Sequence, residues 1–104
     1  MSLMQITIIP VGTGTVSVGS FVADIERFLR EKGVEHSLHD MGTIIAGSTG
    51  ELFAVAEEIH RLPFTKGAER VITHITVDER LDLDRKIGDK QQSVIRIIDG
   101  TEIL

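Results

Sequence analysis

A stretch rich in glycine and hydroxyl residues, IIPVGTGTVSVG, occupies residues 8–19 and is the part of the chain that most resembles a phosphate-binding or nucleophile motif. A phosphate-binding Walker loop ends in lysine and a hydroxyl residue, but this chain has Ser20 and Phe21 at those positions. A dinucleotide-binding fingerprint would need glycine in place of Ser17, and a nucleophile elbow would need glycine in place of Thr15. We therefore interpret the stretch as a turn before a helix, whose free N–H groups could bind a polar ligand atom. The alternative is that its glycines only form the turn.

The histidines and acidic residues lack the spacing of a metal or catalytic site. His36 and His39 are three apart on a predicted strand, so their side chains should face opposite sides of it. His60 and His74 have no carboxylate at ligand spacing, whereas metal sites gather three or four convergent ligands. Adjacent acidic residues, of which the chain has several, are typical of a solvated surface. We expect no metal, no cofactor and no catalytic residue, and hence no enzymatic activity.

The composition predicts one globular domain spanning residues 1–104, with 41% hydrophobic and 26% charged residues. Residues 1–3 precede a second methionine, Met4, and could be a cloning remnant. The absence of cysteine suits a reducing compartment, so we expect a cytoplasmic location. No apolar run is long enough to cross a membrane. The formal charge of −5 argues against a nucleic-acid partner, because binding phosphates requires a surplus of lysine and arginine.

The first half of the chain predicts a buried strand followed by an amphipathic helix. Residues 4–11 are apolar at all but two positions, as in a strand that is buried on both faces. Residues 18–32 carry apolar side chains at three- and four-residue spacing, which indicates a helix with one buried face. We expect Ser17 to cap the start of this helix and Gly33 to end it.

Three further strands are expected. Residues 34–40 and 43–47 should pair through a tight hairpin at positions 40–42. Residues 71–77 alternate β-branched side chains and form the last clear strand. The apolar part of the tail, within residues 81–104, is compatible with either a short helix or a strand.

A second helix is expected between the hairpin and the last strand. Ser48 and Glu51 have the spacing of a capping box, which marks the start of a helix. Proline lacks a backbone N–H and clashes with the preceding turn, so Pro63 should end this helix near Arg61.

The order β-α-β-β-α-β with right-handed crossovers predicts a ferredoxin-like α+β sandwich. It consists of an antiparallel four-stranded sheet with two helices on one face, followed by a C-terminal extension. In this topology the loop at 12–17, the hairpin at 39–43 and the loop at 64–67 should converge at one edge of the sheet.

The face of the sheet that carries no helix should also be apolar. The alternation of the strands places Ile9, Val11 and Ile72 there, on the side opposite Ile6 and Ile8. Leaving several such side chains in water would forfeit several kcal/mol, which is a large part of a small domain's stability. We expect another subunit to cover this face, and the alternative is that the C-terminal tail folds back over it.

Several segments in the same order are shared with one known family: IIPVGTGTVSV at 8–18, MGTII at 41–45, a helix ending near His60, GAERVITHITVDERLD at 67–82, and Lys90, Ser93 and Val94. Taken together, they make the chain resemble the thiamine-binding protein family, small ferredoxin-like proteins formerly catalogued as uncharacterised. The resemblance implies a cytoplasmic homodimer or homotetramer that binds thiamine or its hydroxymethylpyrimidine moiety without known catalysis. Two departures stand out. Ala46 replaces a glutamate that is common in the family, and Pro63 interrupts a helix that usually continues.

The resemblance and the expected geometry point to the same candidate site, where an apolar slot would hold an aminopyrimidine between a few fixed polar groups. The candidate ligand-binding residues come from the glycine-rich loop, the first helix and the hairpin: Gly12, Thr13, Gly14, Ser17, Phe21, His39, Met41, Gly42 and Thr43. The first hypothesis is a non-enzymatic small-molecule binding protein. The alternatives are a ligand-sensing regulatory or scaffold module and an enzyme of unknown type.

Overall fold

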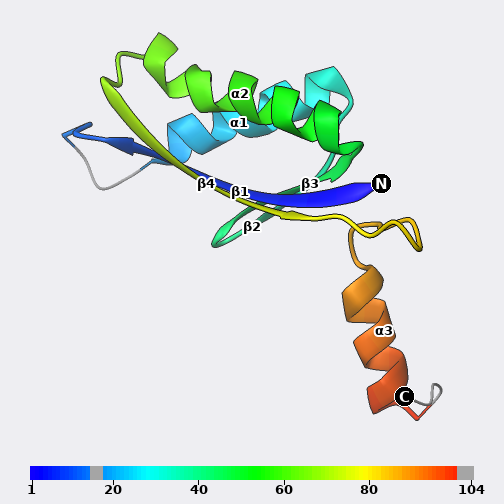
Figure 1. The fold of residues 1–104 in the computed structure, drawn as a ribbon. Coiled ribbons are helices and arrows are strands. Elements are labelled where there is room, and N and C mark those ends of the chain that lie inside the picture. Colours follow the sequence, from blue (N-terminus) through cyan, green and yellow to red (C-terminus); the bar gives the residue numbers. More distant parts are fainter. Residues whose placement is uncertain (15–17, 101–104) are drawn as a thin grey trace.

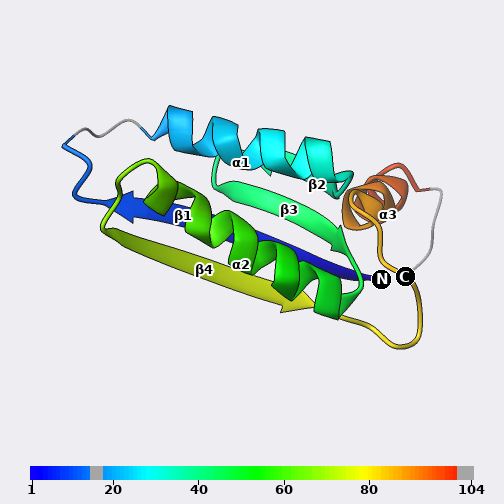
Figure 2. The ribbon, with the colours of Figure 1, turned by 90° about the horizontal axis from the view of Figure 1, so that it is seen from above.

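The computed structural model describes residues 1–14 and 18–100, which fold into a sheet layer covered by a helix layer, with one further helix standing apart (Figure 1). Its elements are β1 (Ser2–Val11), α1 (Gly19–Lys32), β2 (Glu35–His39), β3 (Gly42–Gly47), α2 (Thr49–Thr65), β4 (Arg70–Asp78) and α3 (Asp89–Ile98). The four strands lie in the order β2-β3-β1-β4, and all neighbouring pairs are antiparallel. Helices α1 and α2 lie side by side over one face of the sheet (Figure 2). This is the ferredoxin-like α+β sandwich that the sequence predicted.

The core lies between the sheet and the two covering helices. Alternate residues of each strand point toward the helices, and the helices present one apolar stripe each toward the strands. The fully buried side chains at this contact are Met4, Ile6, Leu29, Ile45, Leu52 and Ile59. The period of two in the strands and of 3.6 in the helices therefore accounts for the layer architecture.

Local sequence signals set most of the element boundaries. Gly33 ends α1 with a left-handed backbone, φ 74°, and its N–H donates to carbonyls in the last turn. Ser48 caps α2, and its hydroxyl accepts a hydrogen bond from the Glu51 N–H at 3.4 Å. Helix α1 has Val18 at its N-cap position, one residue beyond the predicted Ser17, which lies outside the described residues.

The predicted end of the second helix near Arg61 is wrong, because α2 continues through Pro63 to Thr65. Pro63 lacks one backbone N–H, and because it lies in the last turn only two residues of the helix follow the hydrogen bond that is lost. Its ring is fully buried, which favours keeping the proline in the helix. Its carbonyl accepts hydrogen bonds from the N–H groups of Lys66 and Ala68, both at 3.1 Å. The helix interruption inferred as a departure from the family is therefore absent.

The C-terminal part contains a helix, α3, that projects from the side of the sheet opposite α1 and α2 (Figure 1). None of the residues of α3 is buried, and Val94, Ile95 and Ile98 are exposed. The segment 85–88 and the first turn of α3 line a shallow pocket together with Leu3 and Ile44 of the uncovered sheet face. The tail thus covers one part of that face, while Ile9 and its cross-strand neighbour Ile72 are 40% and 38% exposed.

Candidate ligand-binding site

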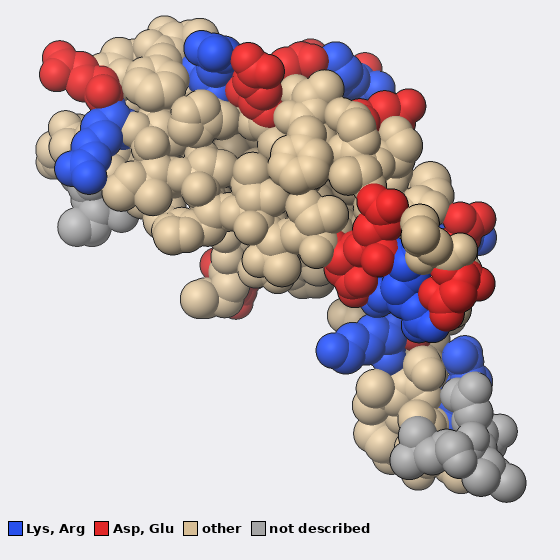
Figure 3. Space-filling model, viewed as in Figure 1, with Lys and Arg blue, Asp and Glu red and all other residues tan. Residues whose placement is uncertain are grey.

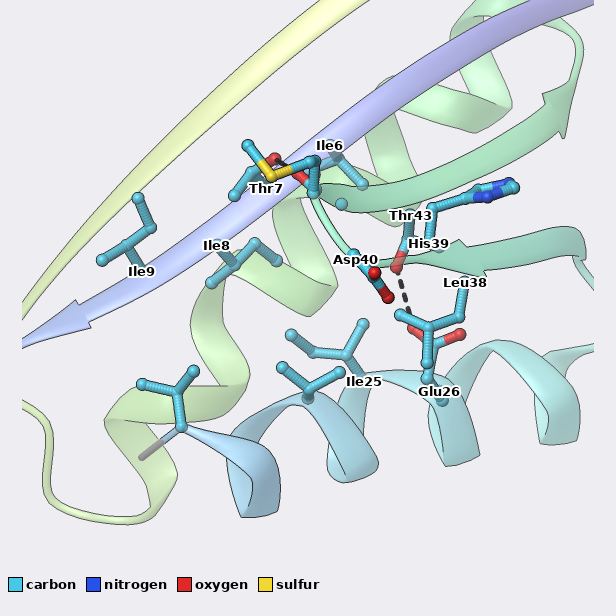
Figure 4. Close-up of a pocket in the computed structure, with 14 residues that line it drawn as sticks. Ile6, Thr7, Ile8, Ile9, Ile25, Glu26, Leu38, His39, Asp40 and Thr43 are labelled. Carbon is cyan, nitrogen blue, oxygen red and sulfur yellow. Dashed lines mark hydrogen bonds between the residues drawn. The ribbon is translucent and has the colours of Figure 1, made fainter. Parts of the chain in front are cut away.

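A cavity of about 330 Å³ lies where β1 extends beyond the β2-β3 hairpin (Figure 4). Strand β1 pairs with β4 from Leu3 to Val11, but with β3 only from Ser2 to Ile6. The remainder of β1 therefore has no neighbouring strand on its β3 side within the described residues. The tip of the hairpin and the first turns of α1 surround this gap, and the cavity forms between the three elements.

The walls of the cavity are mostly apolar. Strand β1, helix α1 and the hairpin supply these side chains: Ile6, Ile8, Ile9, Val18, Val22, Ile25, Leu38 and Met41. Met41 at the turn is 81% exposed, so it lies at the mouth rather than in the depth of the cavity. Such a slot suits the flat, apolar faces of a small ring.

Gly42 allows the hairpin to approach β1 closely. A Cβ atom at this position would lie 2.7 Å from the Thr7 Oγ1 and 3.0 Å from the Ile6 carbonyl oxygen. The Thr7 hydroxyl also donates a hydrogen bond to the Met41 carbonyl at 3.0 Å. The absent side chain and this hydrogen bond together position the hairpin against the strand, and so define one wall of the cavity.

The polar wall of the cavity centres on Thr43 and Glu26. The Thr43 hydroxyl, on β3, donates a hydrogen bond to Glu26 Oε2, on α1, at 3.0 Å (Figure 4). Thr43 is 5% exposed and the Glu26 side chain 15%, so the pair is largely shielded from water. The other carboxylate oxygen, Glu26 Oε1, lies 3.9 Å from His36 Nε2. The His36 Nδ1 lies 2.7 Å from the Val34 carbonyl oxygen and must carry a proton to bond with it, because a carbonyl can only accept.

The structure brings four of the nine predicted site residues into the lining: His39, Met41, Gly42 and Thr43. The His39 ring itself is turned away from Glu26 in Figure 4. The others, Gly12, Thr13, Gly14 and Phe21, do not line the cavity, and Ser17 lies outside the described residues. Gly12 and Gly14 have positive φ angles of 75° and 77°, which favours the interpretation that these glycines form the turn. A ligand-binding role for any of the nine stays a prediction.

Glu26 is the residue that the sequence interpretation missed. It lies on the same helical stripe as Val22, Ile25 and Leu29, at the positions expected of buried apolar residues. A carboxylate at such a position is unusual, because burying a charge is costly without a partner. That exception to the helical pattern was the available signal, although the partner, Thr43, is far away in the sequence.

The groups with clearly shifted pKa values lie away from the cavity. The Lys66 ammonium hydrogen-bonds Asp24 and lowers the pKa of that carboxyl below its usual value. Arg80 lowers the pKa of Asp82 by a hydrogen bond, and the N-terminal amine does the same for Asp84. The last two pairs belong to the charged surface at the base of α3 (Figure 3). These are surface ion pairs, which generally contribute little to stability.

Residues 1–14 and 18–100 lack both a metal-binding cluster and a membrane-spanning helix. They contain no group of three or more histidine, cysteine, aspartate or glutamate side chains placed to hold a metal ion. No helix among them is long and apolar enough to cross a membrane.

The sequence model of the family 'Thiamine-binding protein' matches residues 4–95 of the chain. The chain belongs to the thiamine-binding protein family. Among related sequences, the UPF0045 protein YqgV of Bacillus subtilis is 41% identical over 98 residues, which cover 90% of this chain and 94% of that protein. A UPF0045 protein of Methanothermobacter thermautotrophicus is 34% identical over 95 residues, covering 90% and 96% of the two chains.

Solved structures share the fold of this thiamine-binding family member. MJ1052 of Methanocaldococcus jannascii superposes with a TM-score of 0.79 at 24% identity, over 97% of each chain. A candidate thiamine biosynthesis/salvage protein of Thermotoga maritima gives a TM-score of 0.74 at 14% identity, over 89% of this chain and 97% of that one. At these identities the likeness establishes the ferredoxin-like fold.

The position of Ala46 bears on the other departure from the family, the alanine that replaces a common glutamate. Ala46 pairs with Leu3 and Glu35, toward the end of β3 that is distant from the hairpin. It does not line the cavity between β1, α1 and the hairpin. The alanine therefore leaves the walls of this cavity unchanged.

Proposed function

We propose that this protein is a non-enzymatic binding protein for thiamine or its hydroxymethylpyrimidine moiety, which it holds in the cavity beside Glu26. The observation that carries the proposal is an apolar slot with one polar pair, Thr43 and Glu26, on its wall. Its volume of about 330 Å³ lies at the lower end of the range of small-molecule sites. The family name and the description of one structural neighbour, a candidate thiamine biosynthesis/salvage protein, support thiamine or its pyrimidine as the proposed ligand.

The proposal includes assembly into a homodimer or homotetramer through the uncovered sheet face. Ile9 and Ile72 lie next to each other on that face and are both exposed in the single chain. Helix α3 stands on the same side, with Ile95 55% and Ile98 75% exposed (Figure 1). A second copy seated on the sheet would remove these side chains from water, which is the main driving force of association. A cytoplasmic location and the absence of nucleic-acid and membrane partners stay part of the proposal.

The exposed apolar residues of α3 also favour the second hypothesis, a ligand-sensing regulatory or scaffold module. An amphipathic helix that projects from the domain could bind another protein instead of a second copy. Absence of pyrimidine binding would remove the first hypothesis and leave the second, since a scaffold need not bind a pyrimidine.

The experiment is isothermal titration of the full chain with hydroxymethylpyrimidine, thiamine and unrelated metabolites. We expect saturable heat with one of the first two, and no binding of any of them would contradict the proposal. Val22→Phe would fill the cavity from α1 and should abolish binding, because the added ring occupies the slot. Arg30→Phe adds the same ring on the exposed side of α1 and should leave affinity unchanged.

The absence of catalysis is tested on the same mixtures. After prolonged incubation, mass spectrometry should recover the ligand unchanged. A new product that requires the protein would instead support the enzyme hypothesis.

A further inference from the structure

The carboxylate of Glu26 occupies an unusual position for a charged group. It projects from α1 beside Thr43 into a cavity whose walls are mostly apolar, and only 15% of the side chain is exposed (Figure 4). Asp40 also lines the cavity, but it lies in the exposed hairpin turn at the mouth. Glu26 is therefore the acid that a ligand lying within the slot would meet.

The hydrogen bonds to Glu26 leave much of its accepting capacity unused. An ionised carboxylate has about four lone-pair sites. Among the described residues, its one hydrogen bond comes from the Thr43 hydroxyl, to Oε2. His36 Nε2 lies 3.9 Å from Oε1, which is beyond hydrogen-bond distance. His36 holds a proton on Nδ1 for the Val34 carbonyl, so in the neutral ring Nε2 has no hydrogen to donate.

The unused lone pairs set a chemical requirement on the occupant of the cavity. A bound ring displaces water from the slot, and a carboxylate that loses water without gaining a donor is strongly destabilised. A ligand with N–H groups on the edge that faces Glu26 satisfies this requirement. A ligand with a carbonyl oxygen at the same place would set two groups of lone pairs against each other.

We propose that Glu26, oriented by Thr43, accepts hydrogen bonds from the amino-bearing edge of a heterocyclic ligand and thereby selects amino-heterocycles over their oxo counterparts. This inference rests on the proposed function, because it concerns the same cavity. It adds the residue that determines specificity and the feature of the ligand that this residue recognises.

The test compares three probes by isothermal titration: hydroxymethylpyrimidine with its 4-amino group, the counterpart with a 4-oxo group, and N-methylpyridinium, a cation without N–H groups. The wild-type chain should bind the amino compound about tenfold or more tightly than the oxo compound, since the exocyclic oxygen of the oxo compound can only accept hydrogen bonds and cannot donate one to the carboxylate. N-methylpyridinium should bind weakly. Equal binding of N-methylpyridinium and the amino compound would overturn the inference in favour of simple charge attraction.

Glu26→Gln provides the decisive variant, because the glutamine amide can donate as well as accept a hydrogen bond. The variant should lose most of the preference for the amino compound and gain affinity for the oxo compound. Glu31→Gln, on the exposed side of α1, is the matched control and should keep the wild-type preference. Thermal unfolding of both variants shows whether the fold is retained, and the ratio of the two affinities is insensitive to a small loss of folded protein.

The outcomes separate this inference from the proposed function. If the wild-type chain binds none of the pyrimidines, the proposed function fails. If it binds them but Glu26→Gln keeps the wild-type ratio of affinities, the proposed function stands and the role of Glu26 is refuted.

Discussion

At the scale of single residues, the cavity depends on a side chain that is absent and on one that is unexpectedly charged. Gly42 lets the hairpin lie against Thr7 and Ile6, and Glu26 crosses from α1 to Thr43 on β3. Both contacts join segments that are distant in the sequence. Substitutions at these positions should therefore change the free energy of unfolding by more than typical surface substitutions do.

Gly42→Ala should destabilise the protein by about 1–3 kcal/mol, because the new methyl group would overlap the Thr7 hydroxyl and the Ile6 carbonyl. The measurement is chemical denaturation monitored by circular dichroism. The matched control is Gly50→Ala in α2, where nothing lies within 4 Å of the new Cβ and alanine favours the helix. Equal stability of the Gly42 variant and the wild-type chain would show that the hairpin can shift without cost.

At the scale of elements, lysines near both ends of the α1-α2 pair join the two helices. Lys66, just after α2, contacts Asp24 of α1 at 2.7 Å and lies 5.7 Å from the centre of the Phe21 ring. Lys32, at the end of α1, contacts Glu58 of α2 at 3.0 Å and lies 5.6 Å from the Phe28 ring. Each lysine therefore contacts a carboxylate of the other helix and also lies over a phenylalanine ring.

The Lys66–Asp24 pair predicts a pH dependence of stability. The hydrogen bond from Lys66 lowers the pKa of the folded Asp24 below its ordinary value of 3.8. The stabilisation is therefore present above about pH 4 and is lost as the pH falls through the lower folded pKa. Asp24→Asn should remove this part of the acid dependence, measured as melting temperature between neutral and acid pH.

The effect should be small, because the pair is partly exposed to solvent. Glu57→Gln is the control, since its partner Arg61 lies on the same helix and the pair does not join α1 to α2. Parallel acid profiles for Asp24→Asn and the wild-type chain would contradict the prediction.

At the scale of the molecule, the folded protein is more elongated than a compact domain of this size. Its principal extents are 51 × 28 × 22 Å, because α3 stands away from the sandwich (Figure 1). The uncovered sheet face and α3 lie on the same side of the sheet. A second copy is the occupant that we propose for this side.

Sedimentation of the wild-type chain at micromolar concentration should therefore find dimers or tetramers. Ile72→Asp places a charge on the uncovered face beside Ile9 and should shift the protein toward monomers, because a buried unpaired charge is strongly unfavourable. Phe53→Asp removes an exposed apolar residue from α2, on the other side of the molecule, and should not change the assembly. A wild-type chain that sediments as a stable monomer would refute the proposed assembly.

The amino-acid sequence alone accounts for the four strands, the two covering helices, their order and much of their capping. Gly33 and Ser48 mark helix boundaries through local backbone geometry, and the apolar periods identify the faces that meet in the core. The right-handed crossover rule then leaves few arrangements of four strands and two helices, and the observed one is among them. Interactions of this kind act over a few residues, so a linear sequence contains them.

The location of the cavity and the residues that form it follow from the packing of the folded chain. The cavity exists because β1 continues beyond the last residue that pairs with β3. The pattern of apolar residues in β1 does not show how many of them will pair with a neighbouring strand. The same holds for Glu26 meeting Thr43, and for Pro63, whose burial in the core keeps it inside α2. These outcomes depend on contacts between distant segments, whose free energies outweigh local preferences once the layers pack together.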